Sequence, residues 1–242
     1  MKNYVAVIGQ GGASYKEVLA ALCGEVLLLP PARGMDPRVA SHPDMLMMVL
    51  GRDVVVPASY AGRAEVQSVL NTLRRRCGIR VITTEREPGD TYPHDVVCNG
   101  LLFGSYLYGK RSALAPEILN LAAADGWGVA EVSQGYAGCS ALACCDVLLT
   151  ADPSIRRAVT ERGGDVLFLT SGGIALHGYD TGFIGGAGGF VDGHAVFFGD
   201  VRTHPDGERI TEALSLRGIL CHSLGEGPLT DFGGIKFFSL LS

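Results

Sequence analysis

Apolar and polar residues follow two patterns in this chain, and the two patterns alternate in a fixed order. Segments with apolar residues three and four positions apart predict amphipathic helices. Each of these segments is followed by a glycine. We expect helices at Ser14–Leu22, Ala64–Cys77, Pro116–Ala124, Pro153–Arg162 and Asp206–Arg217, which end at Gly24, Gly78, Gly126, Gly163 and Gly218.

Short β-branched or aliphatic runs come after each glycine and predict strands. These runs are Glu25–Pro30, Ile79–Thr84, Gly128–Ser133, Asp165–Thr170 and Ile219–Leu224. A hairpin fits between such a strand and the next helix. The expected hairpins are Met45–Leu50 with Asp53–Pro57, Val96–Leu102 with Ser105–Tyr108, Ser140–Ala143 with Asp146–Thr150, and Gly189–Val191 with Ala195–Phe198. Asn99-Gly100 is an alternative turn for the second hairpin, and Asp192-Gly193 is the strongest turn signal.

The order of helix, glycine, strand and hairpin recurs about five times, with an average spacing of about 48 residues between the glycines. One unit of this size cannot bury its own apolar face, so the repeat predicts a single α/β domain over residues 1–242 in which the units form a ring. The first strand, Tyr4–Ile8, and the last, Gly234–Leu241, are expected to pair and close the ring.

Two helix starts carry capping signals. Ser14 and Glu17 have the spacing of a capping box, in which the two side chains satisfy free N–H groups at the start of a helix. Asp152 before Pro153 places a hydrogen-bond acceptor at the N-cap and a proline in the first turn. Both signals predict where a helix begins.

The amino-acid composition excludes several classes of function. The chain is 47% hydrophobic and 19% charged, which is typical of a globular protein with an ample core. Its net charge of −5 disfavours nucleic acid as a partner. The apolar N-terminal stretch is too short for a signal peptide, and no segment could span a membrane. Seven cysteines without C-x-x-C spacing indicate reduced thiols, so we expect a cytoplasmic protein.

A dinucleotide-binding motif is nearly present after the first strand, where Gly9-Gln10-Gly11-Gly12 precedes a helix. The motif needs a third glycine and an acidic residue at the end of the next strand. Ser14 stands at the glycine position, and the next strand ends in Pro30-Pro31. We therefore expect no nucleotide and no other cofactor.

Short strings relate the repeat to a known fold. They are His94-Asp95-Val96-Val97-Cys98-Asn99-Gly100 followed by Leu107-Tyr108-Gly109, and Gly233-Gly234-Ile235-Lys236-Phe237-Phe238-Ser239-Leu240. Together with five ββαβ units, they resemble the pentein, or guanidine-modifying-enzyme, fold of arginine deiminase and dimethylarginine dimethylaminohydrolase. The resemblance implies a five-bladed α/β propeller with pseudo-fivefold symmetry. Gln134–Ser140 and Gly182–Gly186 are similar to an uncharacterised bacterial family with this fold.

The resemblance fails at the residues that carry the chemistry. Family hydrolases attack the guanidinium carbon with a cysteine of the last strand and use a histidine as acid and base. Phe237 stands at the position of that cysteine. The stretch Ala137–Cys139, where the family places its histidine, contains none. Ordinary hydrolysis of arginine or dimethylarginine is therefore not expected.

Other residues could still serve chemistry in the central channel that the resemblance implies. Cys139, between Gly138 and Ser140, is the candidate nucleophile, and a buried small hydrophobe is the alternative. His94, beside Asp95, is a candidate general base oriented by a carboxylate.

Aspartates recur near three hairpin starts, at Asp44, Asp95 and Asp231. They either converge on a cationic ligand such as a guanidinium or amine, or cap their local turns. The remaining candidate ligand-binding residues are His42, Asn99, Gln134, Ser140 and Asp180. Histidines beside aspartates could also bind a metal ion, but nothing in the spacing requires one, and we expect none.

Two functions stay open at this point. One is an enzyme of the guanidine-modifying type that uses Cys139, and the other is a catalytically inactive protein that binds a ligand or partner. In both, the expected ligand is a small cationic molecule. The sequence leaves the oligomeric state open, with a homodimer as one option.

Overall fold

The predicted units of helix, glycine and strand all form. In the structure, a computed structural model that describes residues 1–241, the five long helices are α1 (Lys16–Cys23), α4 (Ala64–Cys77), α5 (Pro116–Ala124), α7 (Pro153–Thr160) and α8 (Gly207–Ser215). The glycine that follows or nearly follows each helix has a positive φ angle, between 64° and 108°. Glycine adopts such angles without the steric cost that a Cβ imposes, which is why it ends each helix.

Within residues 1–241 the strands form five three-stranded sheets. In each sheet, the middle strand is antiparallel to one neighbour and parallel to the other. The sheets are β15 (Lys236–Ser239), β1 (Tyr4–Gly9) and β2 (Gly24–Leu29); β3 (Met48–Leu50), β4 (Asp53–Pro57) and β5 (Arg80–Thr84); β6 (Leu101–Phe103), β7 (Tyr106–Gly109) and β8 (Gly128–Glu131); β9 (Ala141–Cys144), β10 (Val147–Thr150) and β11 (Asp165–Phe168); and β12 (Gly188–Val191), β13 (His194–Phe197) and β14 (Leu220–Ser223).

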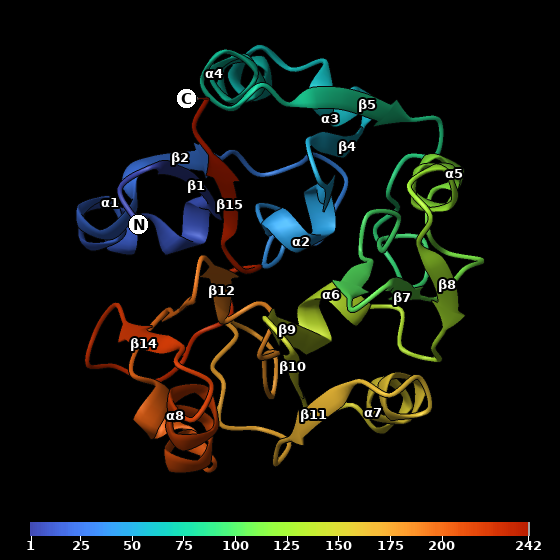
Figure 1. Cartoon of the computed structure of the whole chain (residues 1–242). Coiled ribbons are helices and arrows are strands. Elements are labelled where there is room, and N and C mark those ends of the chain that lie inside the picture. Colours follow the sequence, from blue (N-terminus) through green and yellow to red (C-terminus); the bar gives the residue numbers. More distant parts are fainter. Residues whose placement is uncertain (242) are drawn as a thin grey trace.

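The two ends of the chain share one sheet. Strand β15 pairs antiparallel with β1, so that Tyr4 lies opposite Ser239 and Val7 opposite Lys236. The predicted pairing of the terminal strands is therefore confirmed. Figure 1 shows the sheets arranged around the middle of the molecule, with α1, α4, α5, α7 and α8 on the outside.

Each outer helix buries one apolar face. In α4 the buried side chains include Val66, Leu70 and Leu73, three and four positions apart, whereas Arg75 and Arg76 face solvent. Strand β4 is buried along its whole length. Complete burial of a leucine or valine side chain contributes about 1.5–3 kcal/mol, so these faces hold the helices against the sheets.

The middle of the molecule contains short helices that the sequence pattern did not predict. Helix α2 (Pro43–Leu46) and helix α6 (Ala137–Ser140) are one turn long. They occupy the beginnings of segments predicted as strands, so that β3 starts at Met48 and β9 at Ala141. One turn is too short to show a helical period. Helix α3 (Ala58–Ala61) and the 3₁₀ helices η1 (Gln10–Tyr15) and η2 (Val201–Thr203) complete the elements.

Capping was predicted correctly at one helix and wrongly at another. The Oδ1 atom of Asp152 accepts the N–H groups of Ser154 and Ile155, at 2.8 and 2.9 Å, and caps α7. The capping box at Ser14 and Glu17 is not formed, because η1 continues into α1 and Ser14 lies inside it.

The turns of two hairpins lie one residue later than the predicted strand bounds imply. The second hairpin turns at Gly104-Ser105 and the third at Cys145-Asp146. Asn99-Gly100 precedes the second hairpin and is not its turn. No helix among the described residues is long and apolar enough to cross a membrane.

Candidate functional site

A pocket of about 370 Å³ lies beside the short helices α2 and α6, and we call it the central pocket. Its inner end is formed by buried side chains, namely His42, Met45, Asp95, Cys139 and Asp231. Four aromatic side chains line it further out, namely Tyr92, Tyr136, Tyr179 and Phe183. Two more aspartates, Asp36 and Asp90, stand at its mouth. The pocket is thus both aromatic and acidic.

Asn99 fixes the helix that carries Cys139. Its side chain is completely buried, and its Oδ1 atom accepts the N–H groups of Gly138 and Cys139, at 2.7 and 3.2 Å. Its Nδ2 group donates to the Sγ atom of Cys139, at 2.9 Å, and to the carbonyl of Asp44, at 3.1 Å. Asn99, a predicted ligand-binding residue, therefore lies behind the pocket and orients the thiol.

Cys139 is 4% exposed at the inner end of the pocket. Burial raises the pKa of its thiol well above the ordinary value, and the negative charges of Asp44 and Asp231 raise it further, against the hydrogen bond from Asn99. A nucleophilic cysteine works as the thiolate. In the free protein, this environment favours the neutral thiol.

His42 and Asp231 form a buried pair. The Nδ1 atom of His42 lies 3.6 Å from Oδ1 of Asp231. Burial raises the pKa of Asp231 to about 6; the charge of His42 opposes this shift and that of Asp44 adds to it. Burial also lowers the pKa of His42, against the charge of Asp231. Near pH 7, therefore, the pair holds a carboxylate and a neutral imidazole.

Two backbone groups hold the Asp231 carboxylate in place. Its Oδ2 atom accepts the N–H of Phe183, at 2.9 Å, and its Oδ1 atom accepts the N–H of Gly233, also at 2.9 Å. The contact to Gly233, two residues on, is the local turn bond that the sequence offered as one alternative. Asp231 makes that bond and lines the pocket as well.

Asp44 is 2% exposed and lies behind the pocket in the first turn of α2. Neither of its carboxylate oxygens has a hydrogen-bond partner among the described residues. Burial raises its pKa, and the charge of Lys236 opposes the shift. Burial therefore makes ionisation of Asp44 less favourable than in water.

Asp95 connects the acidic and aromatic parts of the pocket. It is 8% exposed, and its Oδ2 atom accepts the hydroxyl hydrogen of Tyr136, at 2.6 Å. Burial and this hydrogen bond raise the pKa of Tyr136, so its hydroxyl stays a donor. The Oδ1 atom of Asp95 is buried and has no partner among residues 1–241.

The aromatic side chains form a continuous wall. The ring centroids of Tyr92 and Tyr136 are 5.5 Å apart, and those of Tyr136 and Phe183 are 6.2 Å apart in a stacked arrangement. None of these residues was predicted as a site residue. Tyr136 and Phe183 stand in the glycine-flanked strings Gly135–Gly138 and Gly182–Gly185, which is the sequence signal that could have found them.

A guanidinium group already lies on an aromatic ring at the mouth of the pocket. The guanidinium carbon of Arg38 is 4.0 Å from the ring centroid of Tyr179, and its Nε atom donates to Asp36, at 2.9 Å. The hydroxyl of Tyr179 donates to the same carboxylate, at 2.8 Å. The rim thus shows how this combination of residues receives a planar cation.

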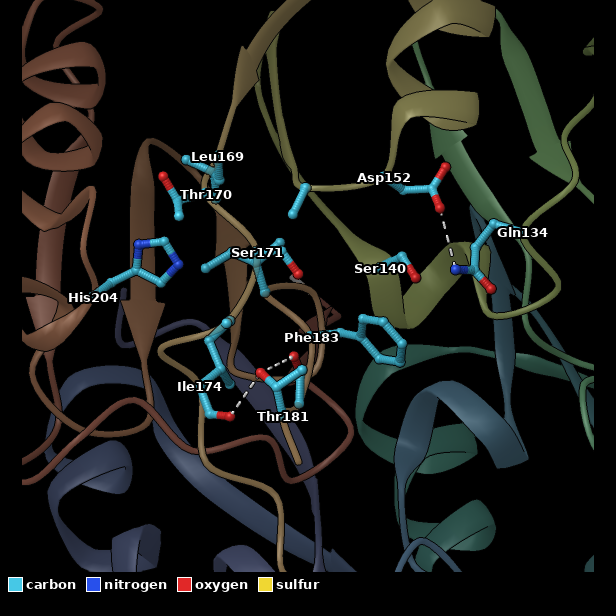
Figure 2. Close-up of a pocket in the computed structure, with 14 residues that line it drawn as sticks. Gln134, Ser140, Asp152, Leu169, Thr170, Ser171, Ile174, Thr181, Phe183 and His204 are labelled. Atoms are coloured by element: carbon cyan, nitrogen blue, oxygen red, sulfur yellow. Dashed lines mark hydrogen bonds between the residues drawn. The ribbon is translucent and has the colours of Figure 1, made fainter. Parts of the chain in front are cut away.

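A second, smaller pocket of about 230 Å³ adjoins the first, and we call it the side pocket. Thr181 and Phe183 line both pockets. Figure 2 shows Gln134 and Ser140, which were predicted for the central channel, in the lining of the side pocket. They do not line the central pocket. The sequence expected one channel, and the structure shows two adjoining pockets.

The structure brings together only some of the predicted site residues. His42, Asp95, Cys139 and Asp231 line the central pocket. His94 and Asp180 are exposed and line neither pocket. Phe237 lies in β15 opposite Ala6, also outside both. Among the described residues, no group of three or more His, Cys, Asp or Glu side chains is arranged to hold a metal ion.

Residues 9–236 match the model of a family described as a family of unknown function (DUF6873). No curated protein matches the chain in sequence.

Several solved structures are similar in fold. One is dimethylarginine dimethylaminohydrolase from Pseudomonas aeruginosa, solved with citrulline, at 11% identity and a TM-score of 0.57, with 90% of this chain and 91% of that chain covered. Another is the N-terminal domain of ArgZ, a cyanobacterial arginine dihydrolase, at 12% identity and a TM-score of 0.52, with 91% and 90% covered. A third is SxtG, an amidinotransferase from Microseira wollei, at 10% identity and a TM-score of 0.54, with 87% and 73% covered. At such low identity these similarities establish only that the chain shares the fold of these proteins.

Proposed function

The chain belongs to the family of unknown function DUF6873, and we propose that this member binds a small organic cation, of the guanidinium or amine type, in its central pocket. One observation carries the proposal: the Oδ1 atom of Asp95 is buried at the pocket and has no hydrogen-bond partner among the described residues. A buried polar atom left unpaired costs about 1–3 kcal/mol, and more if it is charged. A cation with N–H donors would pair it.

The surroundings of Asp95 favour a positive charge. The aromatic wall supplies ring faces, each of which attracts a cation by about 0.5–2 kcal/mol. Asp231 adds a carboxylate at the inner end. No lysine or arginine is among the described residues that line the pocket, although Arg38 and Lys110 contact its rim tyrosines. The names of the similar structures include an arginine dihydrolase and a dimethylarginine dimethylaminohydrolase, so guanidines are the first class to try.

A thiol enzyme at the same pocket is the second candidate, because Cys139 lines the pocket. Such an enzyme needs a thiolate, and the free protein disfavours one. A bound cation would lower the pKa of the thiol by countering the charges of Asp44 and Asp231. Catalysis would therefore depend on the bound substrate, whose positive charge would stabilise the thiolate of Cys139. Binding comes first in both candidates.

We also infer that the five sheets are the blades of one α/β propeller with pseudo-fivefold symmetry. The support is that each sheet repeats the same order of an antiparallel and a parallel pairing.

Two probes of nearly equal shape test the proposed function. Methylguanidinium is a cation and methylurea is its neutral counterpart. The difference between their binding affinities therefore measures how strongly the pocket prefers a positive charge. We expect calorimetric titration at pH 7.5 to show methylguanidinium binding at least about tenfold more tightly, because charge-assisted hydrogen bonds are about twice as strong as neutral ones. Equal binding of the two, or binding of neither, would overturn the proposal.

A further inference from the structure

The side pocket differs from the central pocket in the groups that it offers. Hydroxyl groups dominate its polar lining, at Ser140, Thr170, Ser171 and Thr181, together with the amide of Gln134. Figure 2 shows Ser140 and Gln134 on one side of the pocket and Thr170, Ser171 and His204 on the other. Leu169, Ile174 and Ile184 supply the apolar lining.

Ser140 is the buried residue of this lining whose hydroxyl lacks a partner among the described residues. It is 3% exposed, and its Oγ atom is buried without a hydrogen bond to any described residue. Its backbone groups are both engaged, since its N–H donates to Tyr136, at 2.8 Å, and its carbonyl accepts from Thr150, at 2.9 Å. The hydroxyl is therefore the one polar group of Ser140 that is open to a ligand.

The charged and titratable groups of the side pocket are already engaged. Asp152 accepts from the backbone of Ser154 and Ile155, and its Oδ2 atom accepts from Gln134, at 3.2 Å. His204 is buried, its Nδ1 atom accepts the N–H of Asp206, at 3.0 Å, and burial lowers its pKa. Because the imidazole is neutral and both oxygens of the carboxylate already accept hydrogen bonds, the side pocket is suited to an uncharged group.

The two pockets are placed to hold one molecule. Thr181 and Phe183 line both, and the successive residues Cys139 and Ser140 of α6 line one pocket each. We propose that the side pocket receives an uncharged hydrogen-bonding arm of the same organic cation, a carboxamide or hydroxyl group, with the Ser140 hydroxyl as its partner. This inference rests on the proposed function of the central pocket.

Guanidines with different arms test the inference by calorimetry. The probes are methylguanidinium, linear alkylguanidinium ions, and guanidinium ions whose alkyl arms of two, three or four methylene groups end in a carboxamide. We expect one of the carboxamide probes to bind about 3- to 10-fold more tightly than the linear alkylguanidinium ion of the same length. This difference in affinity corresponds to one neutral hydrogen bond. Ser140→Ala should abolish that difference and leave methylguanidinium binding unchanged.

Ser68→Ala, on the exposed face of α4, is the matched control and should change none of these affinities. The melting temperature of Ser140→Ala should not fall, because the lost hydroxyl makes no hydrogen bond within the protein. The inference is overturned if no carboxamide probe exceeds its alkyl counterpart, or if Ser140→Ala weakens every probe equally. In either case, normal binding of methylguanidinium leaves the proposed function standing. If methylguanidinium itself does not bind, both proposals fall.

Discussion

Aspartates at the edge and at the centre of the molecule are treated differently by the fold. Toward the edge, at the start of the outer helix α7, Asp152 also lines the side pocket, and its carboxylate caps the helix and accepts four hydrogen bonds. At the centre, Asp95 keeps one unpartnered oxygen and Asp44 keeps two among the described residues. The carboxylate of Asp152 completes local structure, whereas these oxygens of Asp95 and Asp44 are paired with no group that the described residues supply.

This difference between paired and unpaired carboxylates predicts which substitutions affect stability and which affect ligand binding. A buried unpaired oxygen lowers the free energy of unfolding, and such groups persist mainly at functional sites. Substitutions at the centre should therefore change ligand binding more than stability wherever they keep the shape of the side chain. Substitutions at the edge should do the reverse.

The largest effect is expected where the backbone packs against the central carboxylate. A Cβ atom on Gly186 would lie 1.9 Å from Oδ1 of Asp231, whose oxygens are fixed by two backbone N–H groups. We expect Gly186→Ala to lower the free energy of unfolding by about 3 kcal/mol or more. Gly227→Ala, where a Cβ meets nothing within 4 Å, is the control and should change it by less than about 0.5 kcal/mol. Urea denaturation of both variants measures this, and equal stabilities would contradict the tight packing at Asp231.

Asp95→Asn should weaken methylguanidinium binding by about 10- to 100-fold, the cost of losing a charge-assisted hydrogen bond. The shape is kept and Tyr136 can still donate to the amide oxygen, so the melting temperature should stay nearly unchanged. Asp90→Asn, at the exposed mouth of the pocket, should change the affinity by less than about threefold because solvent screens it. Similar losses in the two variants would show that general acidity, and not the unpaired oxygen of Asp95, attracts the cation.

Cys139 and Cys145 provide a comparison of thiols, since the former is buried among carboxylates and the latter is exposed at a turn. With iodoacetamide at pH 8, we expect Cys139 to react at least about tenfold more slowly, because the thiolate fraction falls tenfold for each unit by which the pKa rises. Mass spectrometry of the labelled peptides gives both rates. A faster reaction at Cys139 would indicate an activated nucleophile and would favour the thiol enzyme.

The smallest effect is expected at the N-terminus of the outer helix α7. Asp152→Ala removes the cap of α7 and should lower the free energy of unfolding by about 1 kcal/mol, and by no more than about 2 kcal/mol. Methylguanidinium should bind this variant as it binds the unchanged protein. A loss of binding comparable to that of Asp95→Asn would show that the two regions are not independent.

The sequence predicted the edge of the molecule better than its centre. Helices Ala64–Cys77 and Pro116–Ala124 have the predicted bounds, and the cap at Asp152 is formed, because these features depend on residues close in sequence. The pairing of β1 with β15 was predicted from the repeat as a whole. By contrast, α2 and α6 were missed, since each has four residues and is held by contacts from far along the chain, such as that of Asn99 with Gly138.

The site shows the same division. The aspartates and Cys139 were named from their types and positions, but nothing local separates Asp95, which lines the pocket, from Asp44, which lies behind it. Ser140 and Cys139 are neighbours in sequence, and α6 turns them toward different pockets. The tyrosines of the wall lie in loops without periodicity, so only the folded chain assembles them.

The number of protons released when methylguanidinium binds tests most directly whether the central carboxylates receive a cation. The pKa of Asp231 is raised to about 6 in the free protein, and a cation beside it stabilises the ionised form and lowers that pKa. Below pH 6, binding must therefore expel a proton, and affinity must fall as the pH falls. From calorimetry at pH 5.5 in two buffers of different ionisation enthalpy, we expect release of roughly half a proton or more, and close to none at pH 8. Binding without proton release at pH 5.5, or with proton uptake, would contradict a cation site at the buried carboxylates.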